Sequence, residues 1–181
     1  MHSLPGTYAL VFCASMEKAV NIGKLGTLFL KPGFYVYIGS AFGPGGLRAR
    51  INHHLNNFTR PHWHMDYLKG CLNLTEIWYT HDRVHREHQW AETLEQTRGA
   101  SAALPGFGSS GCRCHTHLLF FGSKPPCSRF RRKVHARFSD HNRIMIERPF
   151  KKPLPSLQSA VKPQLLPAIL ADNRPNNSPL P

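Results

Sequence analysis

Acidic side chains are scarce in this sequence. Of its 181 residues 10 are Asp or Glu, against 23 Lys and Arg, so the formal net charge is +13. This balance excludes an acidic, solvating chain. It favours a polyanionic partner, because cationic side chains that neutralise phosphates release counterions. The alternative is a solvated basic segment that binds nothing in particular.

Long apolar runs are also missing. No stretch approaches the roughly 18 apolar residues of a membrane-spanning helix, so we expect no membrane partner. Residues 1–12 lack the basic start and the long apolar stretch of a secretory signal. The five cysteines are an odd number. We therefore expect reduced thiols in a cytoplasmic protein.

The positive charge is concentrated in one segment. Residues 1–122 carry 11 basic and 7 acidic side chains, whereas residues 123–152 carry 10 basic and 2 acidic ones. Seven prolines and little charge over residues 153–181 indicate disorder. The sequence therefore predicts a domain over residues 1–122, a basic extension over 123–152 and a Pro-rich, disordered tail over 153–181.

Residue patterns predict a small α/β (α+β) fold. Alternating or β-branched runs predict strands at Thr7–Phe12, Leu25–Leu30, Phe34–Ile38, Leu74–Tyr79 and His117–Phe121. Apolar residues at helical spacing predict helices at Leu47–Phe58 and Val84–Gln96. We also expect a short helix at Trp63–Leu68 and a basic helix at Arg129–Phe138. Short breaks between the first strands favour antiparallel neighbours. We expect a small, mainly antiparallel sheet flanked by helices.

The helix predicted over residues 47–58 has two distinct stripes. An apolar stripe should face the sheet, and it consists of Leu47, Ile51, Leu55 and Phe58. Arg50 and His54 lie one turn apart on a neighbouring stripe, so their side chains can point to one place. This pair is the first candidate for chemistry.

Four short motifs follow one another in a specific order. They are Gly6-Thr7-Tyr8, Tyr37-Ile38-Gly39-Ser40-Ala41, Leu47–Ile51 followed by His54, and Arg86–Trp90. In this order they resemble the GIY-YIG nuclease superfamily, and residues 63–68 and 106–118 look like signatures of its Uri-type subgroup. The resemblance covers about residues 5–122. It implies a compact sheet flanked by helices and hydrolysis of DNA phosphodiester bonds with one Mg²⁺ or Mn²⁺ ion.

The resemblance also assigns catalytic roles by position. Tyr8 and Tyr37 match the two motif tyrosines, one of which would act as general base toward water. Arg50 matches the arginine that stabilises transition-state charge, in preference to Arg48, because Arg50 lies four residues before His54. These assignments make an active site of two strands and one helix.

The remaining assignments concern the metal and the DNA. Glu87 matches the metal ligand, while His54 and His64 match accessory histidines that orient water or phosphate. A lone carboxylate suits Mg²⁺, which usually keeps several waters. Further side chains are expected to contact DNA, namely Arg48, His53, Arg131, Arg132 and Lys133. Because members of the subgroup also occur beside a base-excision endonuclease domain, base-excision repair proteins are candidate partners.

The sequence departs from the superfamily pattern in three places. Thr7 stands where Ile or Val is usual. Twenty-eight residues separate Tyr8 from Tyr37, so Lys24–Gly33 is interpreted as an inserted hairpin. The late asparagine has no clear counterpart, although Ser109, Ser110 or His117 falls in that region.

The run Cys112-Arg113-Cys114-His115-Thr116-His117 suggests zinc as an alternative. Cys71 or His81 would then complete a set of four ligands. The spacing is unlike a usual zinc knuckle, and in an extended strand Cys112 and Cys114 would face away from His115 and His117. We therefore expect a buried thiol pair with a histidine at the site edge.

Three functions remain open from the sequence, and the last of them is a zinc-dependent structural protein. The first is a metal-dependent DNA endonuclease, acting in DNA repair or processing. The second is a non-catalytic DNA-binding module on the same scaffold, which would bind through the basic extension. The combination of Tyr8, Arg50 and Glu87 favours the first, because a module that only bound DNA would not need all three.

Overall fold

The computed structural model describes residues 1–55 and 61–149, which belong to one compact unit, Met1–Pro149. In chain order its elements are β1 (Gly6–Ala14), β2 (Lys18–Asn21), the 3-10 helix η1 (Gly23–Leu25), β3 (Thr27–Leu30), β4 (Gly33–Ala41), α1 (Gly46–Leu55), the 3-10 helix η2 (His64–Leu68), β5 (Asn73–Thr80), α2 (Glu87–Glu95), β6 (Ala100–Ala102), β7 (Leu118–Phe121), α3 (Cys127–Arg137) and β8 (Met145–Glu147). Phe58 and the predicted tail over residues 153–181 lie outside the described residues.

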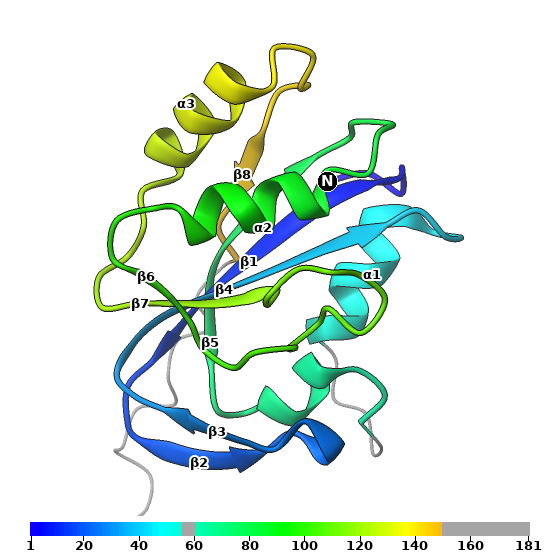
Figure 1. Cartoon of the computed structure of the whole chain (residues 1–181). Coiled ribbons are helices and arrows are strands. Elements are labelled where there is room, and N and C mark those ends of the chain that lie inside the picture. The colour runs from blue at the N-terminus through cyan, green and yellow to red at the C-terminus, as the bar shows by residue number, and fades with distance from the viewer. Residues whose placement is uncertain (56–60, 150–181) are drawn as a thin grey trace, which may run out of the picture. The chain divides into compact units, whose positions relative to one another are not determined.

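Six strands form one antiparallel sheet, in the order β6-β7-β4-β1-β5-β8 (Figure 1). The long strands β1 and β4 lie at its centre, with Tyr8 opposite Gly39 and Leu10 opposite Tyr37. Strand β1 is buried on both faces, and because successive side chains of a strand point to opposite faces, it contributes to a core on each side of the sheet. The α+β class and the mainly antiparallel sheet are confirmed.

The strands β2 and β3 follow β1 and precede β4 in the sequence, and they form a separate two-stranded sheet (Figure 1). It begins at Lys18, earlier than the predicted insertion Lys24–Gly33. The hairpin accounts for the 28 residues between Tyr8 and Tyr37, because the chain leaves β1, makes the hairpin and returns as the neighbouring strand β4. The insertion therefore leaves the two tyrosines on adjacent strands.

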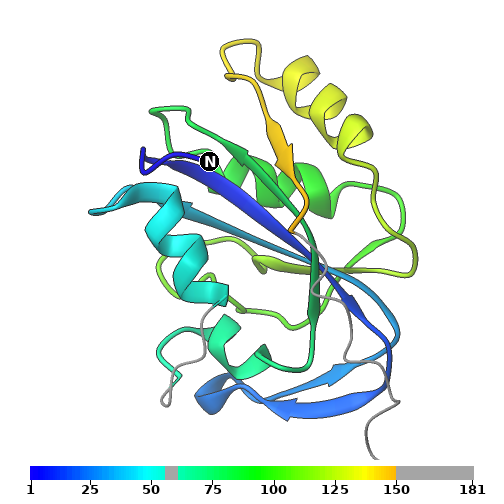
Figure 2. The ribbon, with the colours of Figure 1, turned by 180° about the vertical axis from the view of Figure 1, so that it is seen from behind.

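Each face of the central sheet has its own core. Tyr8, Leu10 and Phe12 belong to one cluster, which also holds residues of α1 and η2. Ala9 and Val11 belong to the other, together with apolar residues of α2 and α3. Figures 1 and 2 show α1 on one side of the sheet and α2 with α3 on the other. The sheet thus separates two helical layers.

The buried face of helix α1 differs from the predicted apolar stripe in the last turn of the helix. Leu47 and Ile51 are buried as predicted, but Leu55 is 46% exposed and His54 is 6% exposed. The prediction for Leu55 was wrong, because the third inward position of the helix is taken by the polar His54. A buried histidine needs a hydrogen-bond partner, and His54 finds it in Tyr8.

Helix α2 begins three residues later than predicted, at Glu87 instead of Val84. In the loop before α2, the Asp82 carboxylate accepts hydrogen bonds from the backbone N–H of Val84 and from Nε of Arg86. Such local side-chain bonds compete with helix formation. The start of α2 at Glu87 is therefore fixed by its preceding loop.

The compact unit extends beyond the boundary predicted at Gly122. Phe130 and Val134 of α3 are buried in the same core cluster as residues of α2, and β8 pairs with β5 at the sheet edge. Residues 123–149 thus complete the same unit as residues 1–122. The described part of the chain holds no helix that is long and apolar enough to cross a membrane.

Candidate active site

Tyr8, Tyr37 and His54 meet on the α1 side of the sheet. The ring centroids of Tyr8 and Tyr37 lie 6.3 Å apart, and that of His54 lies 5.8 Å and 5.6 Å from them. The Tyr8 hydroxyl oxygen is 2.7 Å from His54 Nε2. Three residues chosen from the sequence, on β1, β4 and α1, thus form one cluster.

Gly39 provides the space that this cluster needs. It lies opposite Tyr8, and a Cβ atom added at Gly39 would stand 2.5 Å from the Tyr8 hydroxyl oxygen. That separation is far below van der Waals contact. The glycine of the second motif therefore lets the Tyr8 ring lie across β4 toward His54.

Burial sets the protonation states of the three side chains. Removal from water raises the pKa of Tyr8 well above its usual value and raises the pKa of Tyr37 to about 12. The same effect lowers the pKa of His54 to about 4. At neutral pH both phenols are protonated and the imidazole is neutral. In the tautomer with its proton on Nδ1, His54 can accept the Tyr8 hydroxyl proton.

The His54 pKa predicts that stability falls in mild acid. Protonation favours the unfolded chain between the usual histidine pKa of about 6.5 and the folded value of about 4. The free energy of unfolding should lose about 3 kcal/mol from this residue over that interval, with no further loss below it. Urea unfolding of wild type and His54→Gln from pH 4 to 8 tests this. The difference between the proteins should be constant above pH 7 and shift against wild type below it. A pH-independent difference would contradict the burial argument.

Arg50 points its cation to the edge of the same cluster. Its guanidinium carbon lies 4.3 Å from the ring centroid of Trp63, and the Trp63 ring also contacts His54, with 5.5 Å between ring centroids. Within the described residues no carboxylate pairs with Arg50. A hollow of about 240 Å³ opens beside it, lined by Ala41, Gly43, Pro44, Gly46, Ala49, Arg50, His53 and Trp63. The cation is thus available to an anion in this hollow.

Glu87 lies at the start of α2, in the other helical layer. It is the first residue of α2 and is half-buried, with one oxygen 3.3 Å from His88 Nε2. The Arg86 backbone N–H donates to Thr7 Oγ1 at 3.1 Å. This bond ties the residue before Glu87 to the residue before Tyr8. The bond also gives a reason for threonine at position 7, because Ile or Val has no hydroxyl to accept it.

Two charged side chains, Arg50 and Glu87, affect the pKa values of both tyrosines. Burial has the largest effect on the pKa of Tyr8, followed by the charge interaction with Tyr37. Of the next two effects, Arg50 lowers this pKa and Glu87 raises it. The pKa of Tyr37 responds to Arg50 and Glu87 in the same directions. A cation and a carboxylate therefore have opposite effects on the same two hydroxyl groups.

Arg86 holds Glu87 in place, although sequence reasoning did not select it. Its Nε donates to Asp82 at 2.8 Å and its Nη2 to Asp140 at 2.8 Å. Arg86 and Asp82 are both buried. Their spacing of four residues was the available signal, but Asp140 lies 54 residues away in the sequence.

His64 lies at the periphery of the cluster. Its Nδ1 accepts the backbone N–H of Gly108 at 3.0 Å, and Phe107 stands between it and Tyr37. Asp66 fixes η2 by accepting the backbone N–H groups of His62 and Trp63. Burial raises the pKa of Asp66, but these donors and Lys69 outweigh it and lower the pKa to about 2. His64 is thus held against the loop near residue 108.

The side chains predicted to contact DNA are divided between the two layers. Arg48 is exposed and His53 half-buried on α1. The others lie on α3, where Arg132 is exposed, Arg131 is half-buried and Lys133 bonds the Gln96 carbonyl and Thr97 Oγ1. Of this group, therefore, Arg48 and His53 share a layer with the tyrosine cluster.

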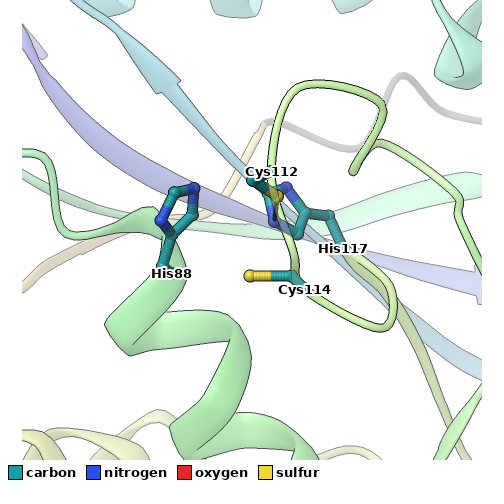
Figure 3. Close-up of side chains that lie close together, drawn as sticks. All are labelled: His88, Cys112, Cys114 and His117. Carbon is teal, nitrogen blue, oxygen red and sulfur yellow. Dashed lines mark hydrogen bonds between the residues drawn. The ribbon is translucent and has the colours of Figure 1, made fainter.

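The cysteine and histidine run forms a loop, so the strand alternation assumed for it was wrong. Cys112 Sγ lies 3.5 Å from His117 Nε2, whereas His115 pairs with Glu95. His88 of α2 joins the group, and the ligand atoms of His88, Cys112, Cys114 and His117 all lie within 4.8 Å of one another (Figure 3). Neither Cys71 nor His81 belongs to it. All five cysteines are free thiols.

Comparison with known proteins gives one family. The model described as Domain of unknown function DUF123 matches residues 7–140. No curated protein and no solved structure matches the chain. The matched residues run from β1 to beyond α3 and include both tyrosines, Arg50, His54 and Glu87. The chain therefore belongs to the family described as Domain of unknown function DUF123.

Proposed function

We propose that this protein is a divalent-metal-dependent endonuclease that hydrolyses DNA phosphodiester bonds, in DNA repair or processing. One observation carries the proposal. The hydrogen-bonded pair Tyr8–His54 lies one helical turn from the cation Arg50, and a bond from Arg86 to Thr7 ties the start of the helix that carries Glu87 to the strand that carries Tyr8. Phosphodiester hydrolysis needs a proton acceptor for water and positive charge for the phosphate, and these residues supply both.

Glu87 fits a hydrated Mg²⁺ or Mn²⁺ ion. Its carboxylate is half-buried, so it remains accessible, and one of its oxygens is engaged by His88. A single hard oxygen ligand with room for water is the donor set that Mg²⁺ accepts. Such an ion would supply positive charge at the phosphate. Glu87 itself would hold the ion at the start of α2.

The other side chains divide the remaining work. The Tyr8 hydroxyl can take a proton from water while passing its own proton to neutral His54 Nε2, 2.7 Å away. The planar guanidinium of Arg50 can bond two phosphate oxygens from the rim of the hollow. The high pKa of Tyr8, caused chiefly by burial, makes the acceptor His54 necessary.

One observation favours the alternative of a non-catalytic DNA-binding module. The basic side chains of α3 lie in the layer opposite α1, so a polyanion could bind there without reaching the tyrosines. This mode predicts salt-dependent binding, because each neutralised phosphate releases counterions. It predicts no turnover.

A cleavage panel distinguishes the two functions. Linear, nicked, flapped and branched DNAs are incubated with the full chain in Mg²⁺, in Mn²⁺ and with EDTA. We expect cutting of at least one substrate in Mg²⁺ or Mn²⁺ and none with EDTA. A mock purification from cells without this protein, prepared in parallel, controls for contaminating nucleases. Salt-dependent binding with every substrate left uncut in both metals would overturn the nuclease proposal and support the binding module.

A further inference from the structure

Four soft or borderline ligands converge beside the candidate active site. Cys112 and Cys114 come from the loop before β7, His117 directly precedes β7, and His88 lies in the first turn of α2. Their ligand atoms all lie within 4.8 Å of one another, and Figure 3 shows the side chains gathered around one point. The function proposed above uses none of these four side chains.

We propose that His88, Cys112, Cys114 and His117 bind one Zn²⁺ ion in a closed, structural site. Two thiolates and two imidazoles are an established tetrahedral zinc donor set, with Zn–S near 2.3 Å and Zn–N near 2.0 Å. Those bond lengths place ligand atoms roughly 3.3–3.8 Å apart in a tetrahedron. Cys112 Sγ and His117 Nε2 already lie 3.5 Å apart, so small side-chain rotations of the others complete the site.

The contacts around the four residues separate this site from a chance thiol pair. His115, in the same sequence run, pairs with Glu95 and is left out. His88 comes from a different element and brings the fourth ligand. A zinc-bound histidine commonly gives its second N–H to a carboxylate, and Glu87 Oε1 lies 3.3 Å from His88 Nε2. The group therefore has a closed ligand set and an outer partner.

The bound ion would connect two segments that matter to the cluster. It would fasten the loop carrying Gly108, whose N–H binds His64, to the start of α2, which carries Glu87. Binding displaces one proton from each thiol, because zinc binds thiolates. Zinc binding can nevertheless be tested separately from nuclease activity. Zinc can be present in an inactive protein, and its absence would leave the cleavage proposal standing.

Metal analysis of the full chain tests the site directly. The protein is expressed in zinc-supplemented medium, and zinc and iron are measured by elemental analysis after gel filtration. We expect one zinc per chain and less than a tenth of that amount of iron. Replacement by Co²⁺ should give the visible absorption bands and thiolate charge-transfer bands of a tetrahedral site, and added Zn²⁺ should abolish them.

Matched variants identify the ligands. His88→Gln and Cys114→Ser should each weaken zinc binding at least 10-fold. His88→Gln should expose both thiols of the group to a thiol reagent, and Cys114→Ser should expose Cys112. His115→Gln and Cys13→Ser alter the same residue types outside the group and should keep one zinc per chain. Circular dichroism of each variant checks folding. A folded wild-type protein without zinc, or His115→Gln losing zinc while His88→Gln keeps it, would overturn the assignment, as would iron in place of zinc.

Discussion

Glu87→Gln is expected to lower the rate of DNA cleavage about 10³-fold, a loss of roughly 4 kcal/mol of transition-state stabilisation. Glutamine keeps the size of the side chain but removes the negative charge that holds the ion. DNA affinity should change less than 3-fold, because the basic side chains are untouched. Glu87 is half-buried at the first position of α2, so the folded structure should survive.

Single-turnover cleavage and binding of the same substrate measure the two effects separately. Glu92→Gln is the matched control, since Glu92 lies on the same helix and makes an exposed ion pair with Arg137, an interaction of small energy. It should cleave at the wild-type rate. If Glu87→Gln also cleaved at that rate, Glu87 would not be the metal ligand, and the proposed site would be wrong.

The central fold could be predicted because its signals are local. The alternation of β1, the aromatic and β-branched run of β4 and the apolar face of α2 depend on residues a few positions apart. The three-residue strands β6 and β8 are too short for a period, and they exist because partners elsewhere in the sheet bind them. For the same reason the domain boundary was placed too early, since β8 joins the sheet through β5.

Some residues of the candidate site could also be predicted from the sequence, and others could not. The order of motifs selected Tyr8, Tyr37 and His54, which the structure brings together. Sequence spacing placed Leu55 in the core, because it could not show that Tyr8 would bond the polar His54 one position earlier. The pairing of His88 with the cysteine loop depends on how α2 packs against that loop. No spacing within the cysteine and histidine run indicates it.

Arg86→Met is expected to lower the free energy of unfolding by about 3 kcal/mol, the usual result of removing one partner from a buried ion pair. Methionine keeps an unbranched, flexible side chain but leaves the buried Asp82 without its cation. Asp82 would still accept the N–H groups of Val84 and Asn142. These bonds do not compensate a buried charge.

Urea unfolding at pH 7 measures the loss, with Arg83→Met as the matched control because Arg83 is exposed in the same loop. The double variant Arg86→Met, Asp82→Asn should recover part of the loss, since it removes the uncompensated charge as well. A loss below about 1 kcal/mol for Arg86→Met would show that this loop is solvated. Its ion pair would then no longer account for the start of α2 at Glu87. A large loss without recovery in the double variant would instead assign the effect to the packing of Arg86 and its bonds to Asp140 and Gln89.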